Sequence, residues 1–181
     1  MNEIVHYKDA LLEILVDEQA LSKRVSELGE EVSRDYSEQD LVLICILRGG
    51  VMFLTDLMRC LSVPHSIDFM SVESYGAGAR DSTGTVRITM DLRTDIQGRH
   101  VLLVEDIVDT GQTLSHVMDL LETRSPASLR VCCLLDKRVR REVDVPIDYI
   151  GFEIPNKFVF GYGLDLDERW RNLPFVGVAR S

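Results

Sequence analysis

Apolar residues along the chain follow two alternating patterns, one of helical spacing and one of short continuous runs. Residues 17–36 show the first pattern, with apolar positions every three or four residues and charges between them, which predicts an amphipathic helix. The run Leu41–Leu47 (LVLICIL) is continuous and rich in β-branched residues, as expected of a strand buried on both faces of a sheet. Gly49 and Gly50 end this run, and residues 51–61 return to helical spacing.

The alternation continues through the rest of the chain. Residues 113–123 have helical spacing, and further strands are predicted at residues 66–74, 86–92, 100–108, 128–137, 148–153, 158–161 and 175–178. Strand–helix–strand alternation indicates βαβ units and a largely parallel sheet with right-handed crossovers. The predicted fold class is therefore α/β, a mainly parallel twisted sheet flanked by helices. Ligand sites in such sheets lie beyond the carboxyl ends of the strands, which are followed here by Arg48–Gly50, Glu105–Thr113 and Asp136–Lys137.

Length, charge and cysteine content narrow the classes of function. The chain has 181 residues, which predicts a single domain over residues 1–181, and a formal net charge of −10. That balance argues against broad binding to nucleic acid, which needs a basic surface. We expect no membrane segment, because no apolar run approaches roughly 20 residues, and no signal peptide. The four cysteines form no C-x-x-C pair and three lie in apolar runs, so we expect reduced thiols and a cytoplasmic protein.

Two adjacent carboxylates follow the buried residues of the predicted strand at 100–108. They are Glu105 and Asp106, in the sequence VEDIVDTGQTL (Val104–Leu114). Crowded carboxylates are expensive unless they are paired with cations or hydrogen-bond donors. A vicinal diol would supply donors, and a hard cation such as Mg²⁺ would bind the oxygens directly or through water.

The next residues, Asp109–Thr113, are typical of a turn into a helix. Free amides and the macrodipole at a helix N-terminus favour an anion. Thr110 and Thr113 add hydroxyl groups, Gln112 lies between them, and Gly111 permits close backbone approach. A group that binds a diol, followed by a phosphate cradle, has the shape of a ribose 5-phosphate site. The alternative is that Asp109 or Thr110 only caps the helix and the acidic pair is solvated.

VEDIVDTGQTL resembles the PRPP-binding signature of type I phosphoribosyltransferases, and the likeness is closest to the hypoxanthine/guanine (6-oxopurine) enzymes. It covers nearly the whole chain. Four further stretches agree in order and spacing: LRGG (Leu47–Gly50), ESYG (Glu73–Gly76), LLDKR (Leu134–Arg138) and IPNKFVFGYGLDLDERWRNLP (Ile154–Pro174). One signature could belong to any relative, whereas five in order are specific.

The resemblance implies an activity, a cofactor and a fold. The activity is transfer of the 5-phosphoribosyl group from PRPP to hypoxanthine and/or guanine, giving IMP or GMP and pyrophosphate in purine salvage, with Mg²⁺ as cofactor. The fold is the type I phosphoribosyltransferase fold, with a small hood formed by the terminal segments. The resemblance also implies a homodimer or homotetramer.

Site roles on the ribose-phosphate side follow from the same resemblance. Glu105 and Asp106 would hold the ribose hydroxyls and, directly or through water, Mg²⁺. Residues Asp109–Thr113 would hold the 5-phosphate. Asp109 would also be the general acid/base, because the attacking ring nitrogen must lose a proton as the glycosidic bond forms.

On the purine side, Lys137 would donate to the exocyclic oxygen of a 6-oxopurine, which disfavours adenine. Phe158 would stack on the base and the Val159 main chain would bond its edge. Asp165 would complete this segment and bind a second Mg²⁺ on the pyrophosphate. Taken singly, Lys137 could be a solvated lysine at a strand end, and Phe158 could be plain core.

By the same resemblance, the pyrophosphate side would comprise Arg48, Gly49, Ser74, Tyr75 and Arg171. Arg48 stands where many relatives have lysine, and the family often has a cis peptide before it, which the sequence leaves open for Leu47–Arg48. Residues 74–86 would form a mobile lid, because the stretch is rich in Gly, Ser, Thr and Ala and has little to bury.

Two alternatives stay open from sequence alone. One is a regulator with the same fold that senses PRPP or nucleotides. The other is an enzyme for a different base, such as xanthine, adenine or uracil. The preference among hypoxanthine, guanine and xanthine is not fixed by these residues, since all three bases carry the 6-oxo group.

Overall fold

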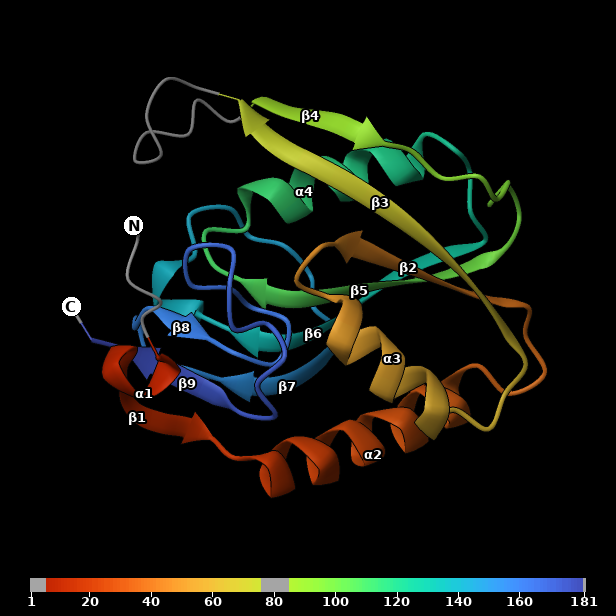
Figure 1. Cartoon of the computed structure of the whole chain (residues 1–181). Helices are drawn as coiled ribbons and strands as arrows, with labels where there is room; N and C mark the ends of the chain where they lie inside the picture. Colours follow the sequence, from red (N-terminus) through yellow and green to blue (C-terminus); the bar gives the residue numbers. More distant parts are fainter. Residues whose placement is uncertain (1–5, 76–84, 181) are drawn as a thin grey trace.

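The computed structural model describes residues 6–75 and 85–180, with side chains up to residue 73 and again from residue 87. Its centre is a six-stranded sheet in the order β4-β3-β2-β5-β6-β7 (Figure 1). The strand bounds are β2 Leu41–Leu47, β3 His65–Tyr75, β4 Thr85–Met90, β5 His100–Val108, β6 Ser128–Asp136 and β7 Tyr149–Glu153. All neighbouring pairs are parallel except β3 and β4, which are antiparallel. The predicted α/β class with a mainly parallel sheet is confirmed.

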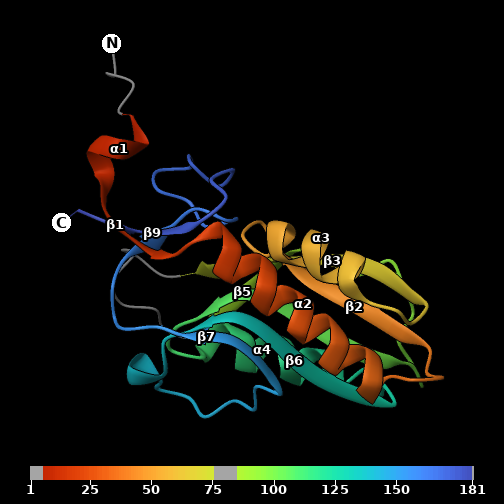
Figure 2. The ribbon, with the colours of Figure 1, turned by 90° about the horizontal axis from the view of Figure 1, so that it is seen from below.

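Helices cover both faces of this sheet. Helices α2 (Glu18–Asp35) and α3 (Val51–Cys60) lie together on one face, and α4 (Gln112–Glu122) lies on the other (Figure 2). A single turn of 3-10 helix, η1 (Arg138–Arg140), follows β6. The helix predicted at residues 17–36 corresponds to α2, whose N-cap Asp17 accepts a hydrogen bond from the Ala20 amide at 2.8 Å.

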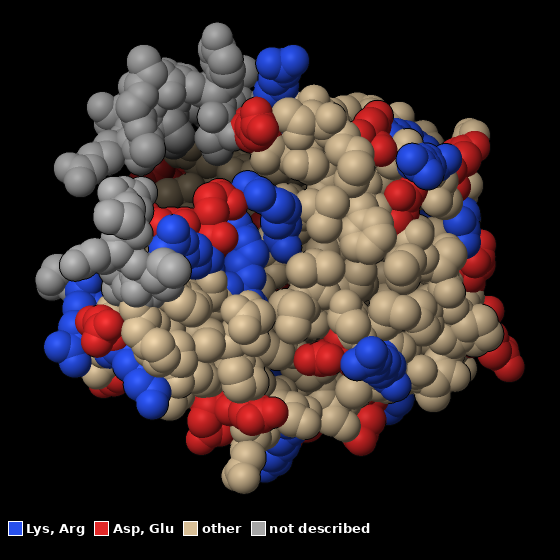
Figure 3. All heavy atoms as spheres, viewed as in Figure 1, with Lys and Arg blue, Asp and Glu red and all other residues tan. Residues whose placement is uncertain are grey.

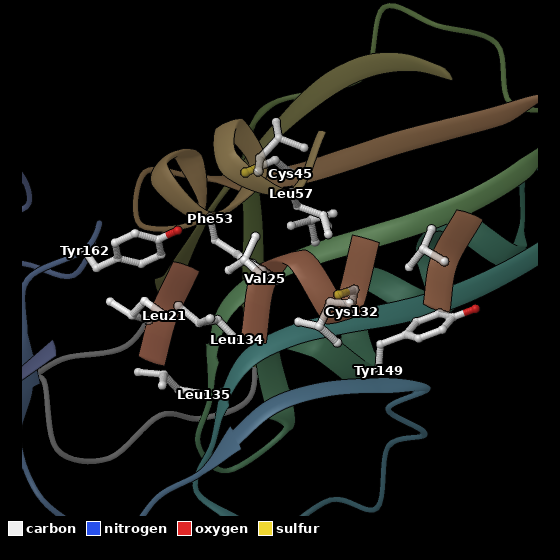
Figure 4. Close-up of a cluster of buried hydrophobic side chains, with 14 of the residues drawn as sticks. Leu21, Val25, Cys45, Phe53, Leu57, Cys132, Leu134, Leu135, Tyr149 and Tyr162 are labelled. Carbon is white, nitrogen blue, oxygen red and sulfur yellow. The ribbon is translucent and has the colours of Figure 1, made fainter. Parts of the chain in front are cut away.

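The continuous apolar run of β2 supplies both cores at once. Successive side chains of a strand point to opposite faces. Leu41, Leu43 and Cys45 therefore join the cluster under α2 and α3, and Val42 and Ile44 join the cluster under α4. Figure 4 shows the first cluster, with side chains of α2 and α3 meeting those of the strands.

The four cysteines are free, as expected. Cys45, Cys132 and Cys133 are buried in the strands, and Cys60 is partly buried. Burial raises the pKa of all four thiols. They are therefore packing residues rather than nucleophiles.

The hood predicted from the resemblance is a separate three-stranded antiparallel sheet, in the order β1-β9-β8. Its strands are β1 (Leu11–Val16), β8 (Val159–Phe160) and β9 (Val176–Ala179), preceded by the short α1 (Tyr7–Ala10). The first and last described segments meet beside it, where the Arg180 amide donates to the Ala10 carbonyl at 2.8 Å. No strand was predicted at β1. Its sequence does not alternate between apolar and polar residues. The structure agrees with this, because register shifts interrupt its pairing with β9 and three of its six residues are exposed.

The predicted lid lies largely outside the described residues, which resume at Thr85. Its flanking backbone is described as the end of β3 paired with the start of β4, through Ser74↔Val86 and Tyr75↔Thr85. Within the described chain, no helix has both the length and the apolar character needed to cross a membrane.

Candidate active site at the carboxyl edge of the sheet

Two adjacent carboxylates, Glu105 and Asp106, lie near the carboxyl end of β5. Asp106 Oδ1 accepts a hydrogen bond from the Ile107 amide at 2.7 Å. A Cβ at Gly49 would lie only 1.6 Å from Asp106 Oδ2, so this glycine lets the loop after β2 approach the carboxylate. The Glu105 Oε2 atom is buried and has no hydrogen-bond partner among the described residues. This carboxylate oxygen of Glu105 therefore lacks a hydrogen bond from the described part of the protein.

Burial raises the pKa of both carboxyls. The pKa of Glu105 lies well above its usual value, through burial and then through the charge of Asp106. Burial raises the pKa of Asp106 to about 6, although backbone hydrogen bonds and the charge of Arg171 act against it. Buried acidic groups without a partner are costly, and carboxylate oxygens are the ligands that Mg²⁺ prefers. The donor set therefore fits a divalent cation.

Asp165, the third predicted metal ligand, does not join this pair in a three-ligand cluster. The described part of the chain holds no group of three His, Cys, Asp or Glu side chains arranged for a metal. Asp165 Oδ1 lies 2.8 Å from Arg171 Nη2, and its Oδ2 accepts from the Glu168 amide at 3.0 Å. Its carboxylate is thus engaged within the C-terminal segment.

The predicted phosphate cradle, Asp109–Thr113, turns from β5 into α4. Gly111 has φ of +87° at the N-cap of α4, a left-handed conformation that favours glycine. A hollow of about 140 Å³ lies here, and Thr110, Gly111 and Thr113 line it together with Glu105. Free amides and the helix dipole make such a place suitable for phosphate. A second hollow of about 360 Å³, between α2 and α3, contains none of the predicted site residues.

Gln112 begins α4 beside this cradle. Its side-chain Nε2 donates to Glu142 Oε2 at 2.8 Å. The carbonyl of Thr110 accepts from the amides of Glu142 and Val143, at 2.9 and 3.0 Å. The segment that follows β6 therefore packs directly against the cradle.

Lys137 follows β6 and reaches Asp109 at the end of β5. Its Nζ lies 3.4 Å from Asp109 Oδ2, and the residue is only 7% exposed. Arg140 Nε donates to the other carboxylate oxygen, Oδ1, at 3.0 Å. The two strands bring these groups together, because Val108 and Asp136 are partners in the parallel ladder of β5 and β6. Asp109 is thus held between two cations.

The predicted pyrophosphate loop begins at Arg48. The Leu47–Arg48 peptide is cis, which the sequence alone left open. Arg48 Nη2 lies 2.9 Å from Glu168 Oε2, and both side chains are mostly exposed. The charge of Arg48 is therefore at the surface, next to the C-terminal segment.

The C-terminal segment rests on this loop through Gly163. A Cβ at Gly163, whose φ is +100°, would lie 2.0 Å from the Gly49 carbonyl oxygen. Arg171 donates from Nη1 to the Gly163 carbonyl at 2.9 Å, while its Nη2 pairs with Asp165. Arg171 is thereby fixed near the loop, as its predicted pyrophosphate contact requires.

Phe158 and Val159 are predicted to bind the purine; Val159 begins the hood strand β8 and Phe158 directly precedes it. Phe158 is 63% exposed, which contradicts the alternative that it is plain core. Val159 is buried and is paired with Val178 of β9. An exposed aromatic ring beside an ordered backbone strand suits a flat base.

Comparisons with known proteins agree with this geometry. The sequence profile of the family described as "Phosphoribosyl transferase domain" matches residues 12–167. The hypoxanthine phosphoribosyltransferase of Salmonella typhimurium is 48% identical over 168 residues, 92% of this chain and 94% of that protein. This chain belongs to the phosphoribosyltransferase family.

Two further relatives place it among the hypoxanthine–guanine phosphoribosyltransferases. The Mycobacterium tuberculosis hypoxanthine-guanine phosphoribosyltransferase is 48% identical over 178 residues, covering 95% of this chain and 88% of that protein. A crystal structure of a Staphylococcus aureus hypoxanthine phosphoribosyltransferase superposes with a TM-score of 0.93 at 42% identity, over 99% of this chain and 96% of that one. The predicted family and enzyme class are confirmed.

In this phosphoribosyltransferase, charged side chains of both signs gather in a hollow on the side toward which β2, β5, β6 and β7 point (Figure 3). Arg140 and Glu168 contact predicted site residues, but they were not predicted. Their only sequence signals are the basic run KRVRR after β6 and the acidic run DLDE near the C-terminus. The predicted side-chain contacts of Ser74 and Tyr75 lie outside the described residues.

Proposed function

We propose that this enzyme transfers the 5-phosphoribosyl group of PRPP to hypoxanthine and guanine, forming IMP or GMP and pyrophosphate. The observation that carries the proposal is the meeting of Lys137 with Asp109 directly beside the cradle of α4. The names of the relatives add support, since they are hypoxanthine or hypoxanthine-guanine phosphoribosyltransferases.

Asp109 is the proposed general base. A ring nitrogen of the purine forms a bond to C1 of the ribose, while the C1–oxygen bond to pyrophosphate breaks and the leaving group takes the electron pair. The proton on the ring nitrogen passes to the Asp109 carboxylate. A carboxylate in this place also stabilises the positive charge that develops on C1.

Lys137 is the proposed determinant of base selectivity. Its buried ammonium has three donors and no acceptor, so it suits a carbonyl oxygen at the purine 6-position. The exocyclic amino group of adenine would instead place its N–H donors against the N–H donors of the ammonium. Phe158 would stack on the base, and the main chain of Val159 would bond its edge.

Glu105 and Asp106 would hold Mg²⁺ near the ribose hydroxyls, directly or through water, and Asp165 would hold a second ion. When bound, Mg²⁺ supplies positive charge to the pyrophosphate leaving group. The Gly49 backbone lies directly against Asp106 Oδ2, where a Cβ would not fit. The acidic pair therefore adjoins the loop after β2. We assign this loop to pyrophosphate, and we assign Arg48 and Arg171 to the same ligand.

We propose that this enzyme works in the cytoplasm as a homodimer or homotetramer. The four free cysteines suit a reducing compartment. Gel filtration with light scattering tests the assembly. A mass of one chain would contradict it.

Steady-state assays with PRPP, MgCl₂ and a panel of bases test the function. We expect IMP and GMP from hypoxanthine and guanine, pyrophosphate in equal amount, no reaction with adenine, and loss of transfer when EDTA removes Mg²⁺. Xanthine belongs in the panel because it also carries the 6-oxo group. Transfer to adenine at a rate equal to that of hypoxanthine, or no transfer to any purine, would contradict the proposal.

A further inference from the structure

We propose that Arg140 is a positioning residue that holds Asp109 in place for proton transfer while Lys137 binds the purine. The inference deepens the proposed function and rests on the role of Asp109 given there. Arg140 lies one turn beyond the lysine, in η1. Its guanidinium contacts the Asp109 carboxylate, and it acts through that group.

The carboxylate of Asp109 is divided between its two cationic partners. Arg140 Nε donates to Oδ1 at 3.0 Å, and Lys137 Nζ lies 3.4 Å from Oδ2. Each cation thus holds a different oxygen. When Lys137 turns its ammonium to the base, the Oδ1 contact can persist and Oδ2 becomes free to accept a proton. Among the described residues, Arg140 is then the remaining cation on Asp109.

The backbone around Arg140 is fixed at both ends. The Arg140 amide donates to the Lys137 carbonyl at 2.8 Å, and the Lys137 amide donates to the Val108 carbonyl at 2.9 Å. Downstream, the amides of Glu142 and Val143 both donate to Thr110. The turn that carries Arg140 is therefore tied to the same strand end and cradle that carry Asp109.

Orientation matters because Asp109 begins a turn and its side chain is 40% exposed. A half-exposed carboxylate can rotate away from the base, and a misplacement of about 1 Å costs a large factor in rate. A guanidinium Nε–H on one oxygen fixes this rotation and leaves the second oxygen directed at the ligand. The role needs an arginine in this turn rather than a general positive charge nearby.

The test uses purified wild-type enzyme and the variants Arg140→Ala, Arg140→Lys, Asp109→Asn and Arg140→Ala/Asp109→Asn. Arg138→Ala is the matched control, because Arg138 lies in the same turn but pairs with Glu153 at 3.6 Å and is mostly exposed. For each we measure kcat and the KM values for PRPP and hypoxanthine, with thermal melting to confirm folding. Assays of Arg140→Ala and Asp109→Asn are repeated with millimolar guanidinium chloride.

Arg140→Ala should lower kcat by roughly tenfold and leave KM for PRPP within about twofold of wild type. The kcat of Arg140→Lys should lie between those of Arg140→Ala and the wild type, and Arg138→Ala should match the wild type. Added guanidinium should recover part of the kcat of Arg140→Ala but none of that of Asp109→Asn. The double variant should be no slower than Asp109→Asn alone, since both changes act on one group.

An unchanged or raised kcat in Arg140→Ala would overturn the inference. So would a rise in KM for PRPP without a fall in kcat, or losses that multiply in the double variant. These results leave the proposed function standing, provided that the wild type makes IMP and Asp109→Asn is impaired. A wild type that makes no nucleotide, or an Asp109→Asn variant with full turnover, would overturn the proposed function and the inference with it.

Discussion

Lys137 has two properties that a base-recognising cation needs, burial and a fixed place. It is 7% exposed, and its amide donates to the Val108 carbonyl at 2.9 Å. Its distance of 3.4 Å to Asp109 is longer than a tight charge-assisted hydrogen bond of about 2.7–2.9 Å. The ammonium is therefore attracted to Asp109 but makes no tight hydrogen bond with it, so it can donate a hydrogen bond to a purine carbonyl.

Lys137→Met should raise KM for hypoxanthine by roughly 10–100-fold and change KM for PRPP far less. The reason is the loss of a charge-assisted hydrogen bond of about 1.5–3 kcal/mol to a buried carbonyl. Steady-state kinetics with each substrate varied in turn measure both constants. Lys23→Met is the control, since Lys23 lies on the exposed side of α2. If PRPP binding weakens and hypoxanthine binding does not, the lysine serves the phosphates instead.

At the residue scale, position after a strand was the useful signal. Asp109 and Lys137 directly follow apolar strands, so their sequence places them at the same edge of a parallel sheet. Arg140 escaped prediction because its contact depends on the single turn of η1, which brings its guanidinium back to Asp109. Phe158 was ambiguous, because an isolated aromatic residue gives no sign of whether it is exposed or buried.

At the scale of elements, Gly163 joins the C-terminal segment to the loop after β2. Gly163→Ala should lower the free energy of unfolding by roughly 2–4 kcal/mol and raise KM for PRPP. A Cβ there would meet the Gly49 carbonyl oxygen at 2.0 Å and push apart two segments that we assign to pyrophosphate. Urea unfolding and PRPP kinetics measure the two effects.

Gly98→Ala is the matched control for this substitution. Gly98 also has a positive φ, +70°, but a Cβ there would meet nothing within 4 Å. It therefore isolates the cost of a left-handed alanine, about 1–2 kcal/mol, with no effect on kinetics. Equal losses at Gly163 and Gly98, or an unchanged KM for PRPP in Gly163→Ala, would contradict the steric account.

Asp68 on β3 ties that strand to the loop before β5. Its carboxylate accepts hydrogen bonds from the amides of Phe69, Arg93 and Thr94, at 2.8, 2.9 and 2.7 Å. Burial alone would raise the pKa of Asp68, but the amides of Thr94, Phe69 and Arg93 outweigh it and lower the pKa below its ordinary value. A lowered folded-state pKa means stability that is present above the unfolded-state pKa, near 4, and lost as the pH falls through the folded-state value.

Asp68→Asn should therefore cost about 1.5–3 kcal/mol of unfolding free energy at pH 7, because it weakens hydrogen bonds to a charged group. The difference from wild type should shrink as the pH falls below about 4. Urea unfolding at a series of pH values measures it, with the exposed Asp144→Asn as control. A difference that stays constant from pH 7 to pH 3 would show that the charge of Asp68 is unimportant.

Elements with strong apolar runs were predictable, and the hood strand β1 was not. The run of β2 fills two cores, so its buried side chains leave a clear signal. In β1, Leu12 and Ile14 are exposed at 59% and 51%, and its partner β9 lies at the other end of the chain. A strand that depends on a distant partner and carries exposed apolar residues leaves little local pattern.

At the scale of the whole molecule, the parallel sheet collects the site from distant parts of the chain. The carboxyl ends of β2, β5 and β6 supply the loop at Arg48, the residues from Glu105 to Thr113, and Lys137. The C-terminal segment then closes against the first of these through Gly163. The ends of parallel strands were predictable from sequence, whereas the docking of the C-terminal segment on this loop was not: the resemblance supplied ligand roles for the segment but not its contact through Gly163.

The measurement that tests the central claim most directly is the turnover of Asp109→Asn. We predict that kcat for IMP formation falls by roughly 10²–10⁴-fold, the range for loss of a general base. Affinity for PRPP, measured by calorimetry in the presence of MgCl₂, should stay within about threefold of wild type, because the backbone amides of the cradle remain. Turnover with hypoxanthine equal to that of the wild type would contradict the account, because the group at the centre of the site would then take no part in the transfer.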